Sequence, residues 1–150
     1  MLQIVFASQT GNAKNLAHVI SESLHSHNIE NDVQDMSDLT PESLSDFSKL
    51  LIVTSTFGDG EPPDNGSEWM SYLKFTDQVS LTNLKFAVLG LGDTYYPHFC
   101  QAGKDFEELL FKHGGSSMIR RLDCDLYYEE QYGEWLEELI GVLKSPVLVK

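Results

Sequence analysis

The segment LQIVFASQTGNAKNLAHVI, residues 2–20, runs from an apolar stretch through a polar loop into a helical pattern. LQIVFA, residues 2–7, is a short apolar run of the kind that forms a strand. After the loop, apolar side chains recur at three- and four-residue spacing, which marks one face of a helix. These side chains are Ala13, Leu16, Ala17, Ile20 and Leu24. A strand that is followed, after one short loop, by a helix predicts an alternating α/β fold.

Further strands are predicted along the rest of the chain. NDVQDM (31–36) alternates like an edge strand, and SMIRRL (117–122) is the weakest pattern. KLLIVTS (49–55) and FAVLGLG (86–92) are nearly continuously apolar. Such continuous runs are expected when helices cover both faces of a parallel sheet.

Helices are predicted between these strands and after the last one. Thr40 and Pro41 suit the cap and first position of a short helix that ends near Phe47. Apolar stripes mark the other helices within 69–73, 106–110 and 135–143. The pattern has no break in composition, so we expect one domain, residues 1–150, built from five βα units.

The composition limits the possible partners. The chain has 10 Lys and Arg against 23 Asp and Glu, and its formal net charge is −13. This charge argues against nucleic acid or an anionic membrane and favours a basic or neutral partner. The start MLQIVFAS lacks the features of a signal peptide, and no apolar run approaches the ~18 residues of a membrane span. We therefore expect a cytoplasmic protein.

The chain contains two cysteines, Cys100 and Cys124, without CxxC spacing. This spacing predicts neither a disulfide framework nor a zinc site. We expect two ordinary reduced thiols and no metal site.

Polar, glycine-rich segments follow the predicted strands. They are SQTGNAKN (8–15), STFGDGEPPDN (55–65), GLGDTYYPHF (90–99) and DCDLYY (123–128). An open parallel sheet binds its ligand outside the carboxyl ends of its strands, where the strand order reverses. We therefore expect these loops to form the binding site.

The first loop has the features of an anion pocket. A helix amino terminus offers unpaired N–H groups, and Ser8, Thr10 and Asn12 add side-chain donors around it. The loop lacks the lysine of a P-loop and the GxGxxG of a dinucleotide fold, so a single phosphate monoester is the expected guest. In the alternative interpretation, Ser8 and Thr10 only cap the helix and Gly11 serves a tight turn.

The second and third loops carry aromatic side chains. Phe57 lies on a segment with two glycines and two prolines, where Gly58 can rotate its peptide at low cost. Tyr96 could face Phe57 across a slot for a flat ligand. In the alternative interpretation, Phe57 folds back into the core and the glycines form a surface turn.

These loops resemble those of the flavodoxin-like family, and the resemblance covers essentially all 150 residues. SQTGNA, STFGDGEPPDN and GLGDTYYPHFCQAGKDFEELL are similar to the FMN-binding domains of diflavin reductases, especially the sulfite reductase flavoprotein. The resemblance implies a three-layer α/β sandwich with a five-stranded parallel sheet of order 2-1-3-4-5 and helices on both faces. It also implies one non-covalent FMN and electrons carried singly.

The resemblance also implies a set of FMN-binding residues. Those on the phosphate loop are Ser8, Gln9, Thr10, Gly11, Asn12 and Ala13. Those on the loop beside the ribityl chain and ring are Ser55, Thr56, Phe57, Gly58, Asp59 and Gly60. Those on the third and fourth loops are Leu91, Gly92, Asp93, Tyr96, His98, Phe99, Cys100 and Asp125. Tyr96 is expected to stack on the flavin, and no residue is assigned a catalytic role.

We expect an electron carrier or the FMN subunit of a reductase more than a self-sufficient enzyme. Its electron donor would be a reductase, an NADPH-dependent flavoprotein, and an acceptor protein would dock on an acidic rim. The rim consists of Asp59, Glu61, Asp64 and Asp93. Part of the acidic excess could instead serve solubility alone.

Two other classes of protein are considered. A response-regulator receiver shares the topology but needs clustered acids after its first strand, where this chain reads VFAS. An NAD(P)H-dependent flavin oxidoreductase acting directly on quinone-type substrates stays open as the alternative, because fold does not settle function.

Overall fold

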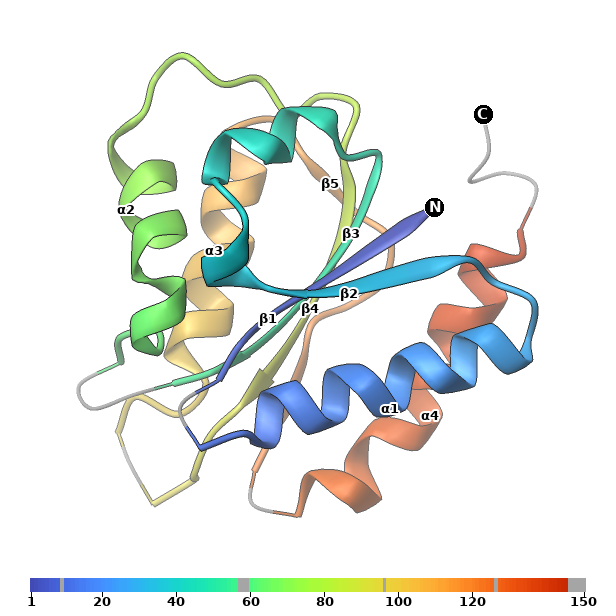
Figure 1. Ribbon diagram of the computed structural model, residues 1–150. Helices are drawn as coiled ribbons and strands as arrows, with labels where there is room; N and C mark the ends of the chain where they lie inside the picture. The colour runs from blue at the N-terminus through green and yellow to red at the C-terminus, as the bar shows by residue number, and fades with distance from the viewer. Residues whose placement is uncertain (9, 57–59, 96, 126, 146–150) are drawn as a thin grey trace.

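The computed structural model describes residues 1–8, 10–56, 60–95, 97–125 and 127–145. Its centre is a parallel sheet with the order β2-β1-β3-β4-β5, in which β6 also pairs with β4 (Figure 1). The strands are β1 (Leu2–Ala7), β2 (Asn31–Asp35), β3 (Lys49–Ser55), β4 (Lys85–Leu91), β5 (Ser116–Ser117) and β6 (Leu122–Cys124). The expected strand order and the edge position of β2 are confirmed.

Helices cover both faces of this sheet, as expected. They are α1 (Asn12–Ser26), α2 (Ser67–Phe75), α3 (Gln101–Lys112) and α4 (Tyr128–Leu143). Short 3₁₀ helices lie at Met36–Asp38 (η1), Pro41–Asp46 (η2) and Asp64–Gly66 (η3). The predicted short helix after Thr40 is therefore a 3₁₀ helix, with Thr40 at its cap position and Pro41 inside its first turn.

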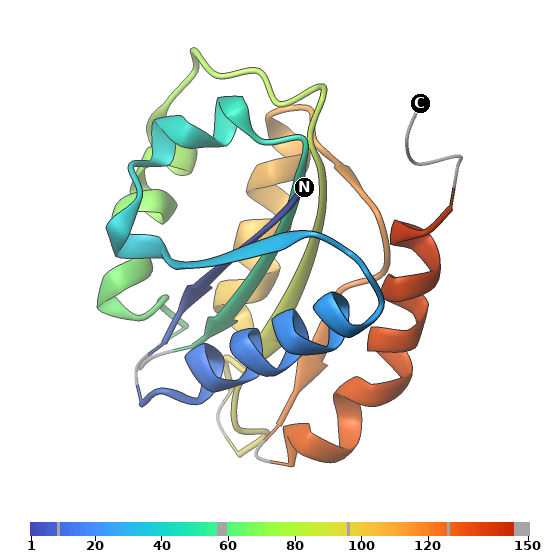
Figure 2. The ribbon, with the colours of Figure 1, turned by 45° about the vertical axis from the view of Figure 1, so that its right-hand side comes forward.

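Alternation along the strands divides the core in two. Ile4 and Phe6 of β1 pack with α1 and α4, whereas Val5 and Ala7 pack with α2 and α3. Figure 1 and Figure 2 show these helix pairs on opposite sides of the sheet. Side chains of a strand alternate between its two faces, and helices cover both faces of this sheet. β1 therefore carries apolar side chains on both faces.

The prediction of one continuous strand at 117–122 is wrong. The fifth sheet position holds two short strands, β5 and β6, separated by 118–121. In that segment the carbonyl oxygen of Arg120 accepts a hydrogen bond from the Trp135 indole of α4 at 2.8 Å. The Trp135 side chain therefore binds a backbone carbonyl that is not part of the β-ladder. The strand pattern of residues 117–122 is weak because the strand is interrupted there.

Within the described ranges, none of the helices has the length and apolar character needed to cross a membrane.

Candidate functional site

The loops after β1, β3, β4 and β6 lie at the same end of the sheet, because all these strands run parallel (Figure 2). This is the arrangement that the sequence predicted for a binding site. Some of the predicted FMN-binding residues lie outside the described residues. They are Gln9, Phe57, Gly58, Asp59 and Tyr96.

The first loop leaves the start of α1 open. Gly11 occupies the cap position with φ of 94°, a left-handed conformation that glycine adopts readily, and no side-chain cap bond is formed at this end. The hydroxyl of Ser8 accepts a hydrogen bond from the backbone N–H of Gly11 at 2.9 Å, outside the helix proper. Thr10 and Asn12 are exposed, whereas Ala13 is buried. In the described residues Ser8 and Thr10 therefore do not act as helix caps, and Ala13 could contact a ligand only through its backbone.

Asn65 ties the first loop to its neighbours, a role that the sequence reasoning missed. Its side-chain oxygen accepts a hydrogen bond from the Ser8 backbone N–H at 3.2 Å. Its side-chain nitrogen donates to Oδ1 of Asp35 at 2.9 Å. The second loop includes this asparagine in its PPDN stretch, but nothing in the spacing there indicates a partner 57 residues away.

The second loop packs against the start of α3. The hydroxyl oxygen of Thr56 accepts a hydrogen bond from the Ala102 backbone N–H at 3.0 Å, and Ser55 is half-buried. Gly60 has φ of 101°, and a Cβ there would lie 3.1 Å from Cβ of His98. The loop therefore needs glycine at this position, both for its backbone conformation and for the close approach to the third loop.

The third loop turns tightly after β4. The Gly92 backbone N–H donates to the carbonyl oxygen of Cys124 at 2.9 Å, which joins the third loop to the fourth. A Cβ on Gly92 would lie 3.0 Å from the backbone nitrogen of Cys100. Oδ1 of Asp93 accepts the Tyr95 N–H at 2.9 Å and so closes the turn that leaves Tyr95 92% exposed.

The remaining predicted residues of the third loop differ in exposure. His98 is exposed, Phe99 is half-buried, and Leu91 and Cys100 are buried. Leu91 belongs to the core that faces α1 and α4. The side chains of Leu91 and Cys100 therefore hold the third loop in position, and only their main-chain groups are available to contact a ligand.

Cys100 is fully buried, which argues against a role as a nucleophile. Burial, together with nearby Asp123 and Cys124, raises the pKa of its thiol to about 12. Burial likewise raises the pKa of Cys124 to about 12, so both groups stay protonated at neutral pH. The Cys100 thiol donates to the carbonyl oxygen of Cys124 at 3.5 Å, and both cysteines are free, as expected.

In the fourth loop, Asp125 closes the turn before α4. Its Oδ1 accepts the Tyr127 N–H at 2.8 Å, and its own N–H donates to the side-chain oxygen of Gln131 at 2.9 Å. Asp125 is half-buried and adds an acidic side chain to this end of the sheet.

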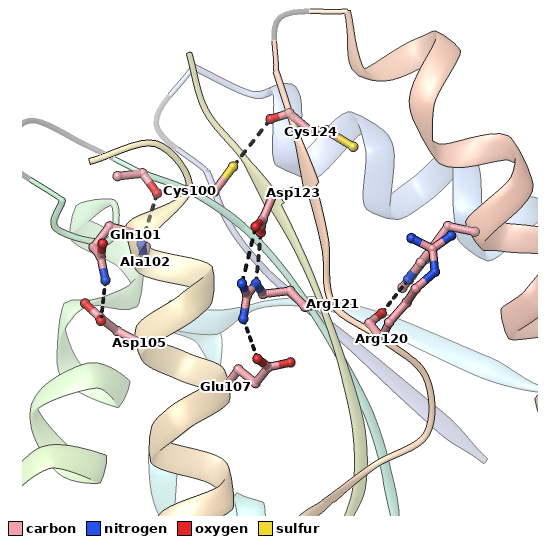
Figure 3. A network of polar contacts seen from close by, with 11 residues as sticks. Cys100, Gln101, Ala102, Asp105, Glu107, Arg120, Arg121, Asp123 and Cys124 are labelled. Carbon is pink, nitrogen blue, oxygen red and sulfur yellow. Dashed lines mark hydrogen bonds and ion pairs between the residues drawn. The ribbon is translucent and has the colours of Figure 1, made fainter. Parts of the chain in front are cut away.

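An ionic network between α3 and β6 stabilises the elements that carry the third and fourth loops. Figure 3 shows Arg121 between Asp123 of β6 and Glu107 of α3. Nε of Arg121 donates to Oδ1 of Asp123 at 3.0 Å, and its guanidinium also pairs with Glu107. Each of these side chains is less than a quarter exposed. The network thus holds β6, and with it Cys124, against α3.

Acidic side chains surround this end of the sheet. Glu61 and Asp64 are exposed, and Asp93 is half-buried, while Asp59 lies outside the described residues. None of the predicted binding residues that the structure describes lines the hollow at the opposite end of the strands, which Leu2, Ile29, Lys49 and Leu143 border.

Comparison with known proteins agrees with this geometry. The family model described as Flavodoxin matches residues 4–135. The chain therefore belongs to the flavodoxin family, whose members bind FMN and work in electron transfer.

The chain is similar to one part of a larger flavoprotein. It is 44% identical over 142 residues to the sulfite reductase [NADPH] flavoprotein alpha-component of Bacillus subtilis (strain 168), covering 95% of this chain and 23% of that protein. The protein of the same name from Vibrio parahaemolyticus is 41% identical over 144 residues, which cover 96% and 23%. The chain thus spans about a quarter of the length of these relatives.

Solved flavodoxins share the fold over nearly their whole length. A flavodoxin of Streptococcus pneumonia TIGR4 has a TM-score of 0.80 and 26% identity, covering 99% of both chains. Oxidised Flavodoxin 2 from Bacillus cereus has a TM-score of 0.79 and 30% identity, covering 95% of this chain and 96% of that one.

The described residues suit the phosphate of FMN. The first turn of α1 presents backbone N–H groups that no described side chain caps, and the dipole of the helix favours an anion there. The Ser8 hydroxyl lies beside this turn with its oxygen already accepting the Gly11 N–H, so its proton is left to donate outward. This donor set is neutral, which fits a monoester better than a pyrophosphate or triphosphate.

Proposed function

We propose that this chain binds one FMN non-covalently at the loops after β1, β3, β4 and β6. We further propose that it passes single electrons from a reductase to an acceptor protein. The observation that supports the proposal most directly is the open start of α1 beside the Ser8 hydroxyl. The family match makes FMN the expected cofactor, and this loop is where we propose that its phosphate is held.

In this proposal the first loop holds the phosphate. Backbone N–H groups of Asn12 and Ala13 face the anion, and the hydroxyls of Ser8 and Thr10 donate to its oxygens. No lysine or arginine has to be desolvated for this contact, so the affinity depends on how well the neutral donors are aligned.

The second and third loops serve the rest of the cofactor. The oxygen of Thr56 already accepts the Ala102 N–H, so its proton is free to donate to a ribityl oxygen. Phe57 and Tyr96 are proposed as the stacking aromatics, which exclude water from the ring. Gly58, Asp59 and Gly60 would bring main chain close to the ring edge.

FMN, when bound, supplies a ring that takes up and releases electrons one at a time. The acids of this end of the sheet oppose negative charge that accumulates on the ring. Several acids near the ring therefore make the fully reduced cofactor a stronger electron donor. They are Glu61, Asp64, Asp93 and Asp125, with Asp59 outside the described residues.

The electron donor is proposed to be an NADPH-dependent flavoprotein, either as a separate protein or as a following part of a longer chain. Support comes from the names of the relatives, of which this chain matches about a quarter. The acceptor is proposed to dock on the acidic rim, since Glu61 and Asp64 are exposed there.

The test is stepwise reduction of the purified protein after reconstitution with FMN. We expect one FMN per chain and a visible spectrum that passes through a separate one-electron stage before it bleaches. NADPH alone should leave the spectrum unchanged until a reductase is added. Rapid bleaching by NADPH alone would favour an NAD(P)H-dependent oxidoreductase acting on quinones, and failure to bind FMN would refute the proposal.

A further inference from the structure

A hydrogen-bonded relay joins the carboxyl ends of two adjacent strands, β2 and β1, to the 3₁₀ helix η3. The side chain of Asn65 bridges Asp35, which ends β2, and Ser8, which follows β1. Asn65 itself lies in η3, after β3. All three residues are half-buried, and the bonds span 30 and 57 positions of the sequence.

Asp35 fixes the orientation of the Asn65 amide. Its Oδ1 accepts from the Ser37 N–H at 2.9 Å and the Ser37 hydroxyl at 2.8 Å, in addition to the Asn65 nitrogen. Burial acts to raise the pKa of Asp35, but these donors and nearby Lys14 together hold it below its ordinary value. An ionised carboxylate can only accept, so the nitrogen of Asn65 must face Asp35 and its oxygen must face Ser8.

This orientation determines what Ser8 can offer to a ligand. Its backbone N–H is occupied by Asn65, and its hydroxyl oxygen accepts from the Gly11 N–H at 2.9 Å. The hydroxyl proton of Ser8 is the donor that these bonds leave available. The relay therefore aligns one donor at the open start of α1.

We propose that Asp35 and Asn65 are positioning residues for the phosphate site, although neither of them contacts the phosphate itself. This inference rests on the proposed function, because the phosphate is that of FMN. A relay that only supports the fold would weaken all ligands of this end of the sheet alike. A positioning relay should weaken ligands that have a phosphate and spare those that lack it.

The first test compares FMN with riboflavin, which lacks the phosphate, on the apoprotein. For Asn65→Ala we expect FMN to bind on the order of 10-fold more weakly, the size of one lost hydrogen bond, and riboflavin within about 2-fold of wild type. Hydrogen exchange of the Ser8 amide, measured by NMR on the apoprotein, should become faster. That second readout does not depend on any flavin.

The second test is a double-mutant cycle on the two relay residues. Asn65→Asp sets two carboxylates against each other and should weaken FMN at least as much as Asn65→Ala. Asp35→Ala removes the carboxylate that orients the Asn65 amide and should also weaken FMN while sparing riboflavin. In the double variant Asp35→Ala/Asn65→Ala the two losses should not add, so the double-mutant cycle should show coupling.

Gln34→Ala is the matched control. Its amide donates to the carboxylate of Asp32 at 2.8 Å within β2, without joining any loops. This variant should keep wild-type affinity for FMN and the wild-type exchange rate at Ser8.

The outcomes separate the relay from the proposed function. Asn65→Ala that binds FMN as wild type does, or that weakens FMN and riboflavin equally, overturns the relay and leaves the proposed function standing. Wild-type protein that binds inorganic phosphate at the Ser8 loop but not FMN overturns the proposed function. In that case, weaker phosphate binding by Asn65→Ala would still support the relay.

Discussion

The hydroxyl oxygen of Thr56 accepts a hydrogen bond from the backbone N–H of Ala102 at 3.0 Å, across 46 residues of chain. Thr56 directly follows β3, and Ala102 lies in the first turn of α3. The Thr56 N–H also donates to the carbonyl oxygen of Leu91 at 3.2 Å. The second and third loops are thus held together at the end of the sheet where we propose that FMN binds.

Thr56→Val keeps the volume of the side chain but removes the acceptor of the Ala102 N–H. We expect the free energy of unfolding to fall by about 1 kcal/mol, as for a lost helix cap, and Tm to fall by about 2–4 °C. Thermal unfolding followed by circular dichroism measures this. The control is Thr40→Val, since Thr40 is exposed and makes no side-chain cap bond. Equal losses in both variants would argue against the capping role of Thr56.

Gly60→Ala should destabilise the protein by about 1–2 kcal/mol, because an L-residue is strained at positive φ. The φ of Gly60 is 101°, and the added Cβ would also meet His98 at 3.1 Å. Gly141→Ala in α4 is the control, because no atom lies within 4 Å of its added Cβ. It should stabilise the helix by up to about 1 kcal/mol. Chemical denaturation measures both effects, and the same sign in the two variants would contradict this account.

Thr10→Leu removes an exposed hydroxyl from the first loop and crowds it. FMN should bind at least ~10-fold more weakly, which is about 1.4 kcal/mol, while riboflavin should bind both proteins similarly. Quenching of flavin fluorescence measures the two affinities. If riboflavin weakens as much as FMN, the loop is structural and does not recognise phosphate.

The buried thiols of Cys100 and Cys124 should make stability depend on alkaline pH. Burial raises both pKa values from 9.0 to about 12, so the unfolded state loses these protons first as pH rises. Their contribution to stability is complete below pH 9 and declines toward pH 12, by up to about 1.4 kcal/mol per pH unit for each thiol. Urea unfolding at increasing pH measures this slope. Cys124→Ala should flatten it relative to wild type, and an unchanged slope would show that the pKa of Cys124 is the same in the folded and unfolded states.

Charge reversal of Glu61 and Asp64 to Lys should slow reduction by a basic reductase and leave FMN affinity nearly unchanged. Electrostatic steering raises association rates by ~10- to 10³-fold and is screened over ~10 Å at 0.1 M salt, so the wild-type rate should also fall as salt rises. Stopped-flow kinetics measure the rates. The matched control reverses Glu30 and Asp77, which are exposed in segments leading into the strands at the opposite end. A rate that does not respond to salt or to reversal of Glu61 and Asp64 would exclude the acidic rim as the docking site.

Much of the candidate site could be predicted as a set of loops, because parallel strands bring their carboxyl ends to one edge. Its internal bonds could not be predicted. Ser8 was expected beside a phosphate, but its hydrogen bond with Asn65 depends on how two separate loops approach each other. Asp125 and Asp93 were expected near a flavin ring, and the structure shows that each also closes a local turn.

The sequence by itself determined the strand and helix order, because apolar periodicity is a local property that each segment carries with it. It also determined which loops are rich in glycine and hydroxyls. Only the tertiary structure decided that the fifth strand is interrupted at 118–121, that Thr56 caps α3, and that Asn65 links Asp35 to Ser8. These features depend on hydrogen bonds between groups tens of residues apart, whose distance and direction exist only after the sheet register and the helix packing are set.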